Sequence, residues 1–113
     1  MSAVETLPIE PASVFAALGD PTRLAIVSQL RDGRARSIAE LTEAAPITRQ
    51  AVTKHLRVLE DAGLVASARI GRESRFALKP EPIRQAGAYL EEVAQLWEAA
   101  LGRLKAFVEE QQD

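Results

Sequence analysis

The 113-residue sequence contains no cysteine and a single histidine, His55. The absence of cysteine excludes disulfide bonds, thiolate metal sites and cysteine nucleophiles. With one histidine, a zinc, nickel or copper site within one chain would depend almost wholly on carboxylates, a poor ligand set for these metals. We therefore expect neither a metal nor another cofactor. A glycine-rich phosphate loop and a set of nucleophile, base and orienting group are also missing, which argues against an enzyme.

Long apolar segments are missing as well. No run approaches the roughly twenty apolar residues that cross a membrane, and the N-terminus lacks the basic and apolar stretches of a secretory signal. We therefore expect a cytoplasmic protein with no membrane partner. The length and the 47% hydrophobic content are those of one globular domain. We expect residues 1–9 to form a flexible arm and residues 10–113 to form that domain.

The net charge of −2 is distributed unevenly along the chain. Residues 47–79 contain seven basic and three acidic residues, a net charge of +4, whereas residues 1–46 carry −2 and residues 80–113 carry −4. A local basic surface attracts phosphates even when the total charge is negative. The distribution therefore favours a middle segment that faces nucleic acid.

The segment 47–65 is the most informative part of that basic region. It predicts a helix over about 48–62, with Thr48 as the N-cap and Gly63 as the stop. Steps of 100° per residue separate an apolar face from a polar one. The apolar face consists of Val52, Leu56 and Leu59, and the polar face consists of Gln50, Thr53, Lys54 and Arg57. An amphipathic helix with such a polar face is typical of a DNA recognition helix.

Three shorter helices are expected before it. They run from Pro11 to Leu18, from the cap Asp20 to about Arg31, and from the capping box of Ser37 and Glu40 to about Ala44. The second helix should bury Leu24, Val27 and Leu30, and the third Ile38 and Leu41. A turn of about three residues would then join the third helix to the fourth, which makes a helix-turn-helix.

A hairpin follows the fourth helix. Residues 64–69 and 74–78 alternate as strands do, around a turn at 70–73. This hairpin, at about 64–78, carries Arg69, Arg72 and Arg75 and forms a wing beside the helix-turn-helix. The predicted fold class is mainly α with a small β-hairpin: a winged helix-turn-helix of about five helices and a two-stranded wing.

The last predicted helix, at about 83–110, is too apolar for a lone surface helix. Its apolar residues recur at three- and four-residue steps over a length that a winged-helix core cannot cover. The apolar surface that the core leaves uncovered indicates a symmetric dimer in which the first helix shares the interface. The candidate interface residues are Val14, Phe15, Leu18, Leu90, Val93, Trp97, Leu101 and Leu104.

In this order and spacing, the motifs resemble those of the ArsR family of bacterial winged-helix repressors, from Phe15 to about Val108. The matching residues are Leu18-Gly19-Asp20-Pro21-Thr22-Arg23-Leu24, Ile38-Ala39-Glu40-Leu41, the segment from Thr48 to Val65, and Gly71-Arg72. The resemblance implies a homodimer on an inverted-repeat operator, with the first and last helices forming the interface. It also implies that Thr48, Gln50, Thr53 and His55 approach DNA.

The metal-sensing relatives use a Cys-x-Cys pair in the third helix, or histidines and carboxylates in the last helix. This sequence has neither a cysteine pair in its third helix nor a histidine in its last. It is therefore more similar to the metal-independent branch, for which the resemblance implies no single effector.

The predicted function is sequence-specific binding to double-stranded DNA by a dimeric repressor. The candidate DNA contacts are Thr48, Arg49, Gln50, Thr53, Lys54, His55, Arg57, Arg69, Arg72 and Arg75. His55 lies about 140° from Gln50, at the edge of the apolar face, which favours a packed or phosphate-bonded side chain over a ligand. Two alternatives stay open: a winged-helix module that binds protein without reading DNA, and a metal- or ligand-responsive sensor of the same fold.

Overall fold

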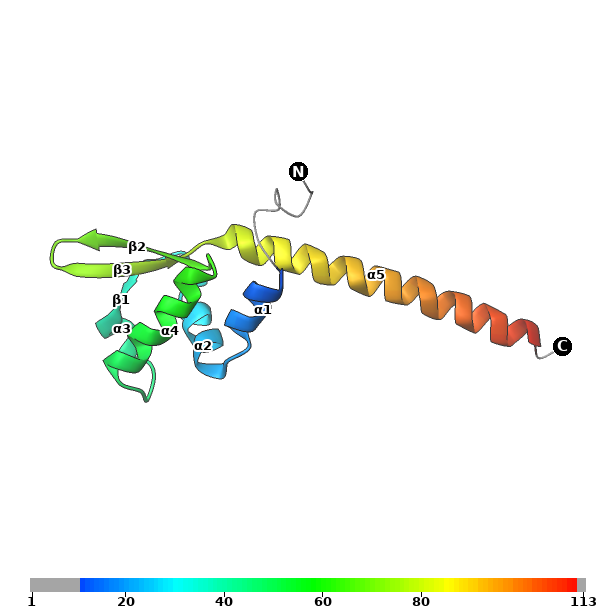
Figure 1. The fold of residues 1–113 in the computed structure, drawn as a ribbon, viewed down its shortest axis with the longest axis horizontal. Helices are drawn as coiled ribbons and strands as arrows, with labels where there is room; N and C mark the ends of the chain where they lie inside the picture. The colour runs from blue at the N-terminus through cyan, green and yellow to red at the C-terminus, as the bar shows by residue number, and fades with distance from the viewer. Residues whose placement is uncertain (1–10, 112–113) are drawn as a thin grey trace.

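The computed structural model describes residues 11–111, so the expected N-terminal arm at 1–9 lies outside the described residues. Within them the fold is a winged helix-turn-helix of five helices and one three-stranded antiparallel sheet (Figure 1). The elements are α1 (Pro11–Leu18), α2 (Pro21–Gln29), β1 (Arg36–Ser37), α3 (Ile38–Glu43), α4 (Arg49–Asp61), β2 (Val65–Ile70), β3 (Glu73–Leu78) and α5 (Pro80–Gln111). The predicted fold class is confirmed.

The core lies where α1, α2, α3 and α4 meet the base of the sheet. Side chains from all of these elements are buried in one cluster, which includes Val14, Leu30, Leu41, Leu59 and Val65. Each fully buried leucine or valine of this kind contributes about 1.5–3 kcal/mol relative to an exposed side chain. The winged domain is therefore held together mainly by apolar burial.

One face of α2 differs from the prediction. Leu24, expected to be buried beside Val27 and Leu30, is 51% exposed, and Ile26 is buried instead. The helix ends at Gln29 rather than at about Arg31, with Leu30 as its C-cap. Ile26 and Leu30 stand one turn apart, and Leu24 lies about 160° around the helix from Ile26. Val27 and Leu30 are buried as predicted, so only Leu24 was assigned to the wrong face.

The sheet has a strand that the sequence pattern did not reveal. β1 contains only two residues, and it pairs with β3 through Arg36 opposite Phe76 and Ser37 opposite Arg75. The strand order is β1-β3-β2, so the wing hairpin is anchored through β3. Two residues are too few to show the alternation by which strands are recognised.

Two connections also differ from expectation. The wing turn is shorter than predicted, because Ile70 pairs with Glu73 and leaves only Gly71 and Arg72 between the strands. Gly71 has φ +66°, as the first central position of a type II′ hairpin turn requires. The turn between α3 and α4 is longer than predicted and contains five residues, 44–48.

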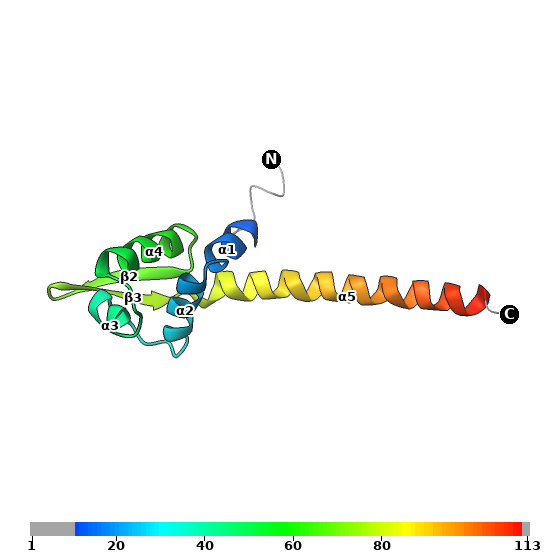
Figure 2. The same cartoon turned by 90° about the horizontal axis from the view of Figure 1, so that it is seen from below.

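Helix α5 begins at Pro80, three residues earlier than expected, and continues to Gln111. Proline fits its first turn because the missing N–H has no partner there in any helix. Only its first turns enter the core, where Pro82 and Ala86 are buried. Beyond Tyr89, whose ring lies 6.2 Å from that of Phe15, α5 projects away from the domain (Figures 1 and 2). None of the helices in 11–111 is long and apolar enough to span a membrane.

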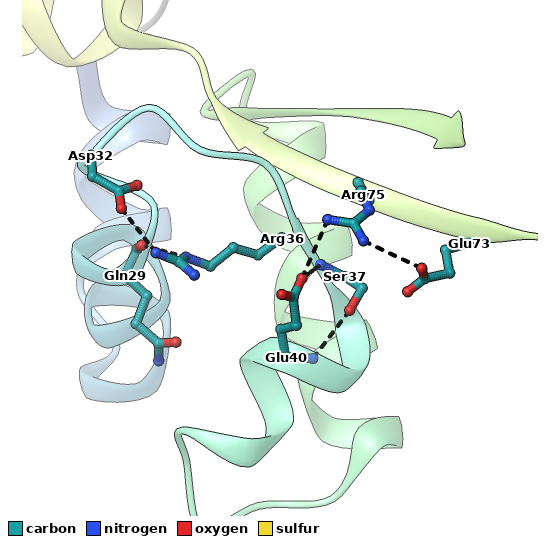
Figure 3. A network of polar contacts seen from close by, with 7 residues as sticks. All are labelled: Gln29, Asp32, Arg36, Ser37, Glu40, Glu73 and Arg75. Atoms are coloured by element: carbon teal, nitrogen blue, oxygen red, sulfur yellow. Dashed lines mark hydrogen bonds and ion pairs between the residues drawn. The ribbon is translucent and has the colours of Figure 1, made fainter. Parts of the chain in front are cut away.

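A polar network ties the start of α3 to the sheet (Figure 3). The predicted capping box is present: the Ser37 backbone N–H donates to Glu40 Oε1 at 2.9 Å, and the Glu40 N–H donates to Ser37 Oγ at 3.2 Å. Arg75 of β3 lies 3.6 Å from the same Glu40 Oε1. The orientation of α3 is therefore coupled to the strand that carries the wing.

The carboxylate of Glu40 should contribute to the pH dependence of stability. The hydrogen bond from the Ser37 N–H, together with the charge of Arg75, holds the pKa of Glu40 below its usual value of 4.5. A pKa that is lower in the folded chain stabilises the fold above the unfolded value, and this stabilisation is lost as the pH falls through the folded pKa. We expect Glu40→Gln to lose stability less steeply than the native chain between about pH 5 and about pH 3 in urea titrations.

The matched control is Glu43→Gln, at the exposed end of α3, which should keep the native pH dependence. Equal slopes for Glu40→Gln and the native chain would contradict this role of Glu40.

Candidate nucleic-acid interface

Helix α4 has the boundaries that its capping residues predict. The Thr48 hydroxyl accepts a hydrogen bond from the Ala51 N–H at 3.1 Å. At the other end Gly63 adopts φ +78°, and the Leu64 N–H donates to the Leu59 carbonyl at 2.9 Å. This glycine stop returns the chain to the sheet directly after the helix. Both ends of α4 are therefore fixed by local interactions.

The apolar face of α4 determines which side chains face outward. Val52, Leu56 and Leu59 are buried in the core, at 0–1% exposure. The outward side presents four exposed polar side chains: Arg49, Gln50, Lys54 and Arg57. Thr53 is half-buried, and its hydroxyl donates to the Arg49 carbonyl at 2.8 Å. The structure thus presents one continuous polar face on α4 to solvent.

Three of the predicted arginines meet in one place. Arg49, from the first turn of α4, and Arg69 and Arg72, from the wing, line a shallow hollow of about 190 Å³. Residues 37–39 at the start of α3 also line it. Its one acidic lining residue, Glu73, is paired with Arg75 at 3.4 Å. The hollow is therefore suited to an anion, and it connects the recognition helix with the wing.

Arg75 lies in a different environment from the other wing arginines. Its guanidinium contacts Glu40 at 3.6 Å and Glu73 at 3.4 Å, and its side chain is 32% exposed (Figure 3). We expected a DNA contact here, but these carboxylates neutralise the guanidinium and hold it against the start of α3. Arg75 belongs to the support of the wing, because its strand position brings it opposite Ser37.

His55 also differs from the expected set. Its Nδ1 lies 3.3 Å from Arg23 Nη1 and 3.9 Å from Asp20 Oδ2. Arg23 lies in the first turn of α2 and Asp20 is its N-cap, so both contacts join His55 to the start of that helix. The structure places His55 in the packing between α2 and α4, the packed alternative that its angular position favours, rather than on the outward face with Gln50.

Arg23 makes contacts with α1 and α4 that the sequence did not predict. Its Nε donates to the Ala17 carbonyl at 2.7 Å, at the end of α1, while Nη1 contacts His55 of α4. Asp20 caps α2 as predicted, accepting from the Thr22 and Arg23 N–H groups. The hydrogen bond from the Arg23 N–H is the main cause that lowers the pKa of Asp20. Arg23 therefore connects α1 with the recognition helix.

The predicted interface residues differ in their exposure. Leu90, Val93, Trp97, Leu101 and Leu104 of α5 are 45–64% exposed, whereas Phe15 and Leu18 are half-buried. Val14 is completely buried. Val14 was a wrong choice for the interface, because the α1 turn that carries it faces the domain's own core. Across residues 11–111, no three His, Asp or Glu side chains are grouped as a metal site would require.

Comparison with known proteins gives a consistent result. A family model described as a helix-turn-helix domain matches residues 18–68. The HTH-type transcriptional repressor SmtB of Mycobacterium tuberculosis is 42% identical over 62 residues, which cover 55% of this chain and 45% of SmtB. The matched segment therefore covers less than half the length of that relative.

Solved structures show the same similarity over more of the chain. An ArsR-like transcriptional regulator from Rhodococcus is 37% identical, with a TM-score of 0.75 over 86% of this chain and 91% of that chain. The homodimeric winged helix-turn-helix DNA-binding domain Mb0332 from Mycobacterium bovis is 26% identical, with a TM-score of 0.60 over 74% and 77% of the two chains.

Arg23→Ala tests the connection between α1 and α4. The substitution removes a donor to the Ala17 carbonyl and the contact with His55, so we expect the free energy of unfolding in urea to fall by about 1–3 kcal/mol. Arg23→Lys should recover only part of this stability, because an ammonium lacks the planar fork of a guanidinium. The control Arg31→Ala removes an exposed arginine. Equal stability of Arg23→Ala and Arg31→Ala would refute the bridging role.

Proposed function

The chain belongs to the ArsR family of winged helix-turn-helix transcriptional regulators, and we propose that it acts as a homodimeric repressor on an inverted-repeat operator. The observation that carries the proposal is the polar face of α4. This face points to solvent because the opposite face is buried in the core, and the arginines of the wing extend it. Repression would follow from occupation of a promoter. The similarity over 55% of this chain to SmtB, which is named a transcriptional repressor, supports repression rather than activation.

The side chains of α4 suit the major groove. Gln50 can form a bidentate pair with adenine, and Arg57 can bind guanine or a phosphate. Lys54 offers a point charge without the planar fork of arginine, which suits a phosphate. In a twofold-symmetric dimer, two such helices would enter successive major grooves about 34 Å apart. The sequence specificity would then come from Gln50 and Arg57.

The arginine hollow supplies the non-specific part of the binding. Arg49, Arg69 and Arg72 come from α4 and the wing, and all three line the same hollow. We assign this hollow to one backbone phosphate at the edge of the groove that α4 enters. A phosphate held there would fix the recognition helix and the wing in one register on the DNA. Arg75 and His55 are not included among the proposed contacts.

The homodimer is supported by the exposed apolar surface of α5. A contiguous apolar patch on one helix marks an interaction surface, and Mb0332 is a homodimer of similar fold. The alternative of a winged-helix module that binds only protein does not account for the net +4 charge of residues 47–79. Salt-dependent binding to duplex DNA separates the two functions.

The double substitution Gln50→Ala with Arg57→Ala tests base reading. Each good base contact contributes about 1–3 kcal/mol, so we expect specific operator affinity to fall by about two orders of magnitude or more. Fluorescence anisotropy with an operator selected from random DNA measures the affinity. The matched control removes an arginine and a glutamine from exposed positions of α5, Arg84→Ala with Gln95→Ala. Native affinity in the α4 variant would overturn the assignment of α4.

The salt dependence of binding tests whether the three arginines share one phosphate. The slope of log affinity against log salt becomes shallower by about 0.9 for each phosphate that the protein no longer neutralises. Because the remaining arginines would still hold the phosphate, we expect Arg49→Ala and Arg72→Ala alone to change the slope little. Loss of all three arginines should make it shallower by about 1.8, one phosphate in each half-site of the dimer. A reduction by about 1.8 in each single variant would show that the arginines bind separate phosphates.

A further inference from the structure

Asp61, the last residue of α4, lies on the same side of the helix as the proposed base contacts. Steps of 100° per residue place it about 20° from Gln50 and about 40° from Arg57. Its side chain is exposed, as theirs are. The other polar side chains within about 60° of Gln50 are those of Thr53, Lys54 and Arg57, which are neutral or positive. The outward face of α4 therefore ends in a carboxylate.

This carboxylate has no charged partner that would explain its position. None of the ion pairs within residues 11–111 includes Asp61. Arg23 and Asp61 line the same hollow of about 370 Å³ between α1 and α4, but the guanidinium of Arg23 contacts the Ala17 carbonyl and His55. The carboxylate of Asp61 is therefore open to solvent at the end of the outward face.

The position of Asp61 is also unfavourable for the stability of α4. The C-terminal end of a helix carries a partial negative charge, which repels a carboxylate in the last turn. Glu60 lies in the same turn, but it accepts a hydrogen bond from Ser67 Oγ at 2.9 Å and so joins α4 to β2. In the described part of the chain Asp61 has no corresponding bond. Its carboxylate weakens the helix without a compensating contact in the fold, which indicates a role toward a ligand.

The edges of the bases offer few groups that a carboxylate can bind. An ionised carboxylate only accepts hydrogen bonds. In the major groove the donors are the exocyclic amino groups, N4 of cytosine and N6 of adenine, whereas guanine and thymine present acceptors. Adenine also presents its N7 acceptor beside N6, so cytosine is the base whose edge repels a carboxylate least. A carboxylate in the major groove therefore selects cytosine.

We propose that Asp61 is a specificity-determining residue, which accepts a hydrogen bond from the N4 amino group of one cytosine in each half-site of the operator. The inference rests on the proposed function, in which α4 lies in the major groove, and adds a base position that Gln50 and Arg57 do not read. A wrong base at this position loses the hydrogen bond and also repels the carboxylate. Repulsion of the wrong ligand is an effective source of specificity.

The geometry of the helix sets where that cytosine lies. Each residue of an α-helix advances about 1.5 Å along the axis, so Asp61 is about 16.5 Å beyond Gln50 and about 6 Å beyond Arg57. Successive bases of one DNA strand are about 3.4 Å apart. The cytosine therefore lies about five base pairs from the base that Gln50 reads, and about two base pairs beyond the position of Arg57.

Binding of the full-length chain to a set of operator variants tests the proposal. An operator is first selected from random DNA with the native chain, and each base pair of its half-sites is then changed to the other three, symmetrically in both halves. Fluorescence anisotropy measures the affinity of every DNA for the native chain, Asp61→Asn and Gln50→Ala. The matched control is Glu98→Gln, which neutralises an exposed carboxylate on α5.

For the native chain we expect guanine or thymine in place of one cytosine to weaken binding about tenfold or more. In Asp61→Asn this preference should shrink to about threefold or less, because an amide can also donate to the acceptors of guanine and thymine. Preferences at the other positions should stay native. The position that Asp61→Asn relaxes should lie about five base pairs from the one that Gln50→Ala relaxes, and Glu98→Gln should relax none.

The alternative role of the carboxylate is repulsion of the DNA backbone. In that case Asp61→Asn strengthens binding to every sequence by the same factor and leaves all base preferences native. This result overturns the proposal, as does relaxation at a position next to the one that Gln50→Ala relaxes.

Unfolding in urea separates a role in DNA binding from a role in the fold. Asp61→Asn removes a charge that the helix end repels, so we expect its urea midpoint to equal or exceed the native one. A clearly lower midpoint assigns Asp61 to the fold and overturns the proposal. A native chain that prefers no DNA sequence contradicts the proposed function itself, whereas the other adverse results contradict only the role of Asp61.

Discussion

The burial of one face of α4 is the constraint that organises the rest of the site. Val52, Leu56 and Leu59 occupy the centre of the core, so the helix cannot rotate without exposing all three. Their burial fixes the opposite face, with Gln50 and Arg57, toward solvent. The capping residues Thr48 and Gly63 fix where that face begins and ends. A polar surface capable of reading DNA is thus a consequence of apolar packing behind it.

Polar contacts outside the reading face hold the neighbouring elements in place around α4. Arg23 joins the end of α1 to His55, and Arg75 joins β3 to the start of α3 through Glu40. Because of these contacts, His55 and Arg75, which were both predicted to contact DNA, bind neighbouring groups of the protein instead. Arg49 of α4 and Arg69 and Arg72 of the wing line a common hollow, so positive charge is concentrated between the recognition helix and the wing.

The sequence predicted those parts of the fold whose signals are local. The caps and the apolar stripe of α4 lie within about fifteen residues, and the capping box of α3 within four, so both were found. The two-residue strand β1 and the contact of Arg75 with Glu40 depend on pairing between segments far apart in the sequence, which no periodicity records. Leu24 was placed in the core because it lies three residues before Val27, but the packed face of α2 runs through Ile26 instead. The partner of His55 lies 32 residues away in the sequence, so only its position at the edge of the apolar face was predictable.

The proposed function requires α4 to lie in the major groove of each half of a twofold-symmetric operator. Affinity cleavage measures this placement: the cysteine-free chain is given one cysteine at the exposed position 46, in the turn before α4 and outside the proposed base contacts. An iron chelate is attached to it, and the cleavage of operator DNA is mapped on both strands. We expect two cleavage centres, about one helical turn apart and related by the operator's twofold axis. Cleavage at a single centre, or none above that of free chelate, would contradict the placement of α4.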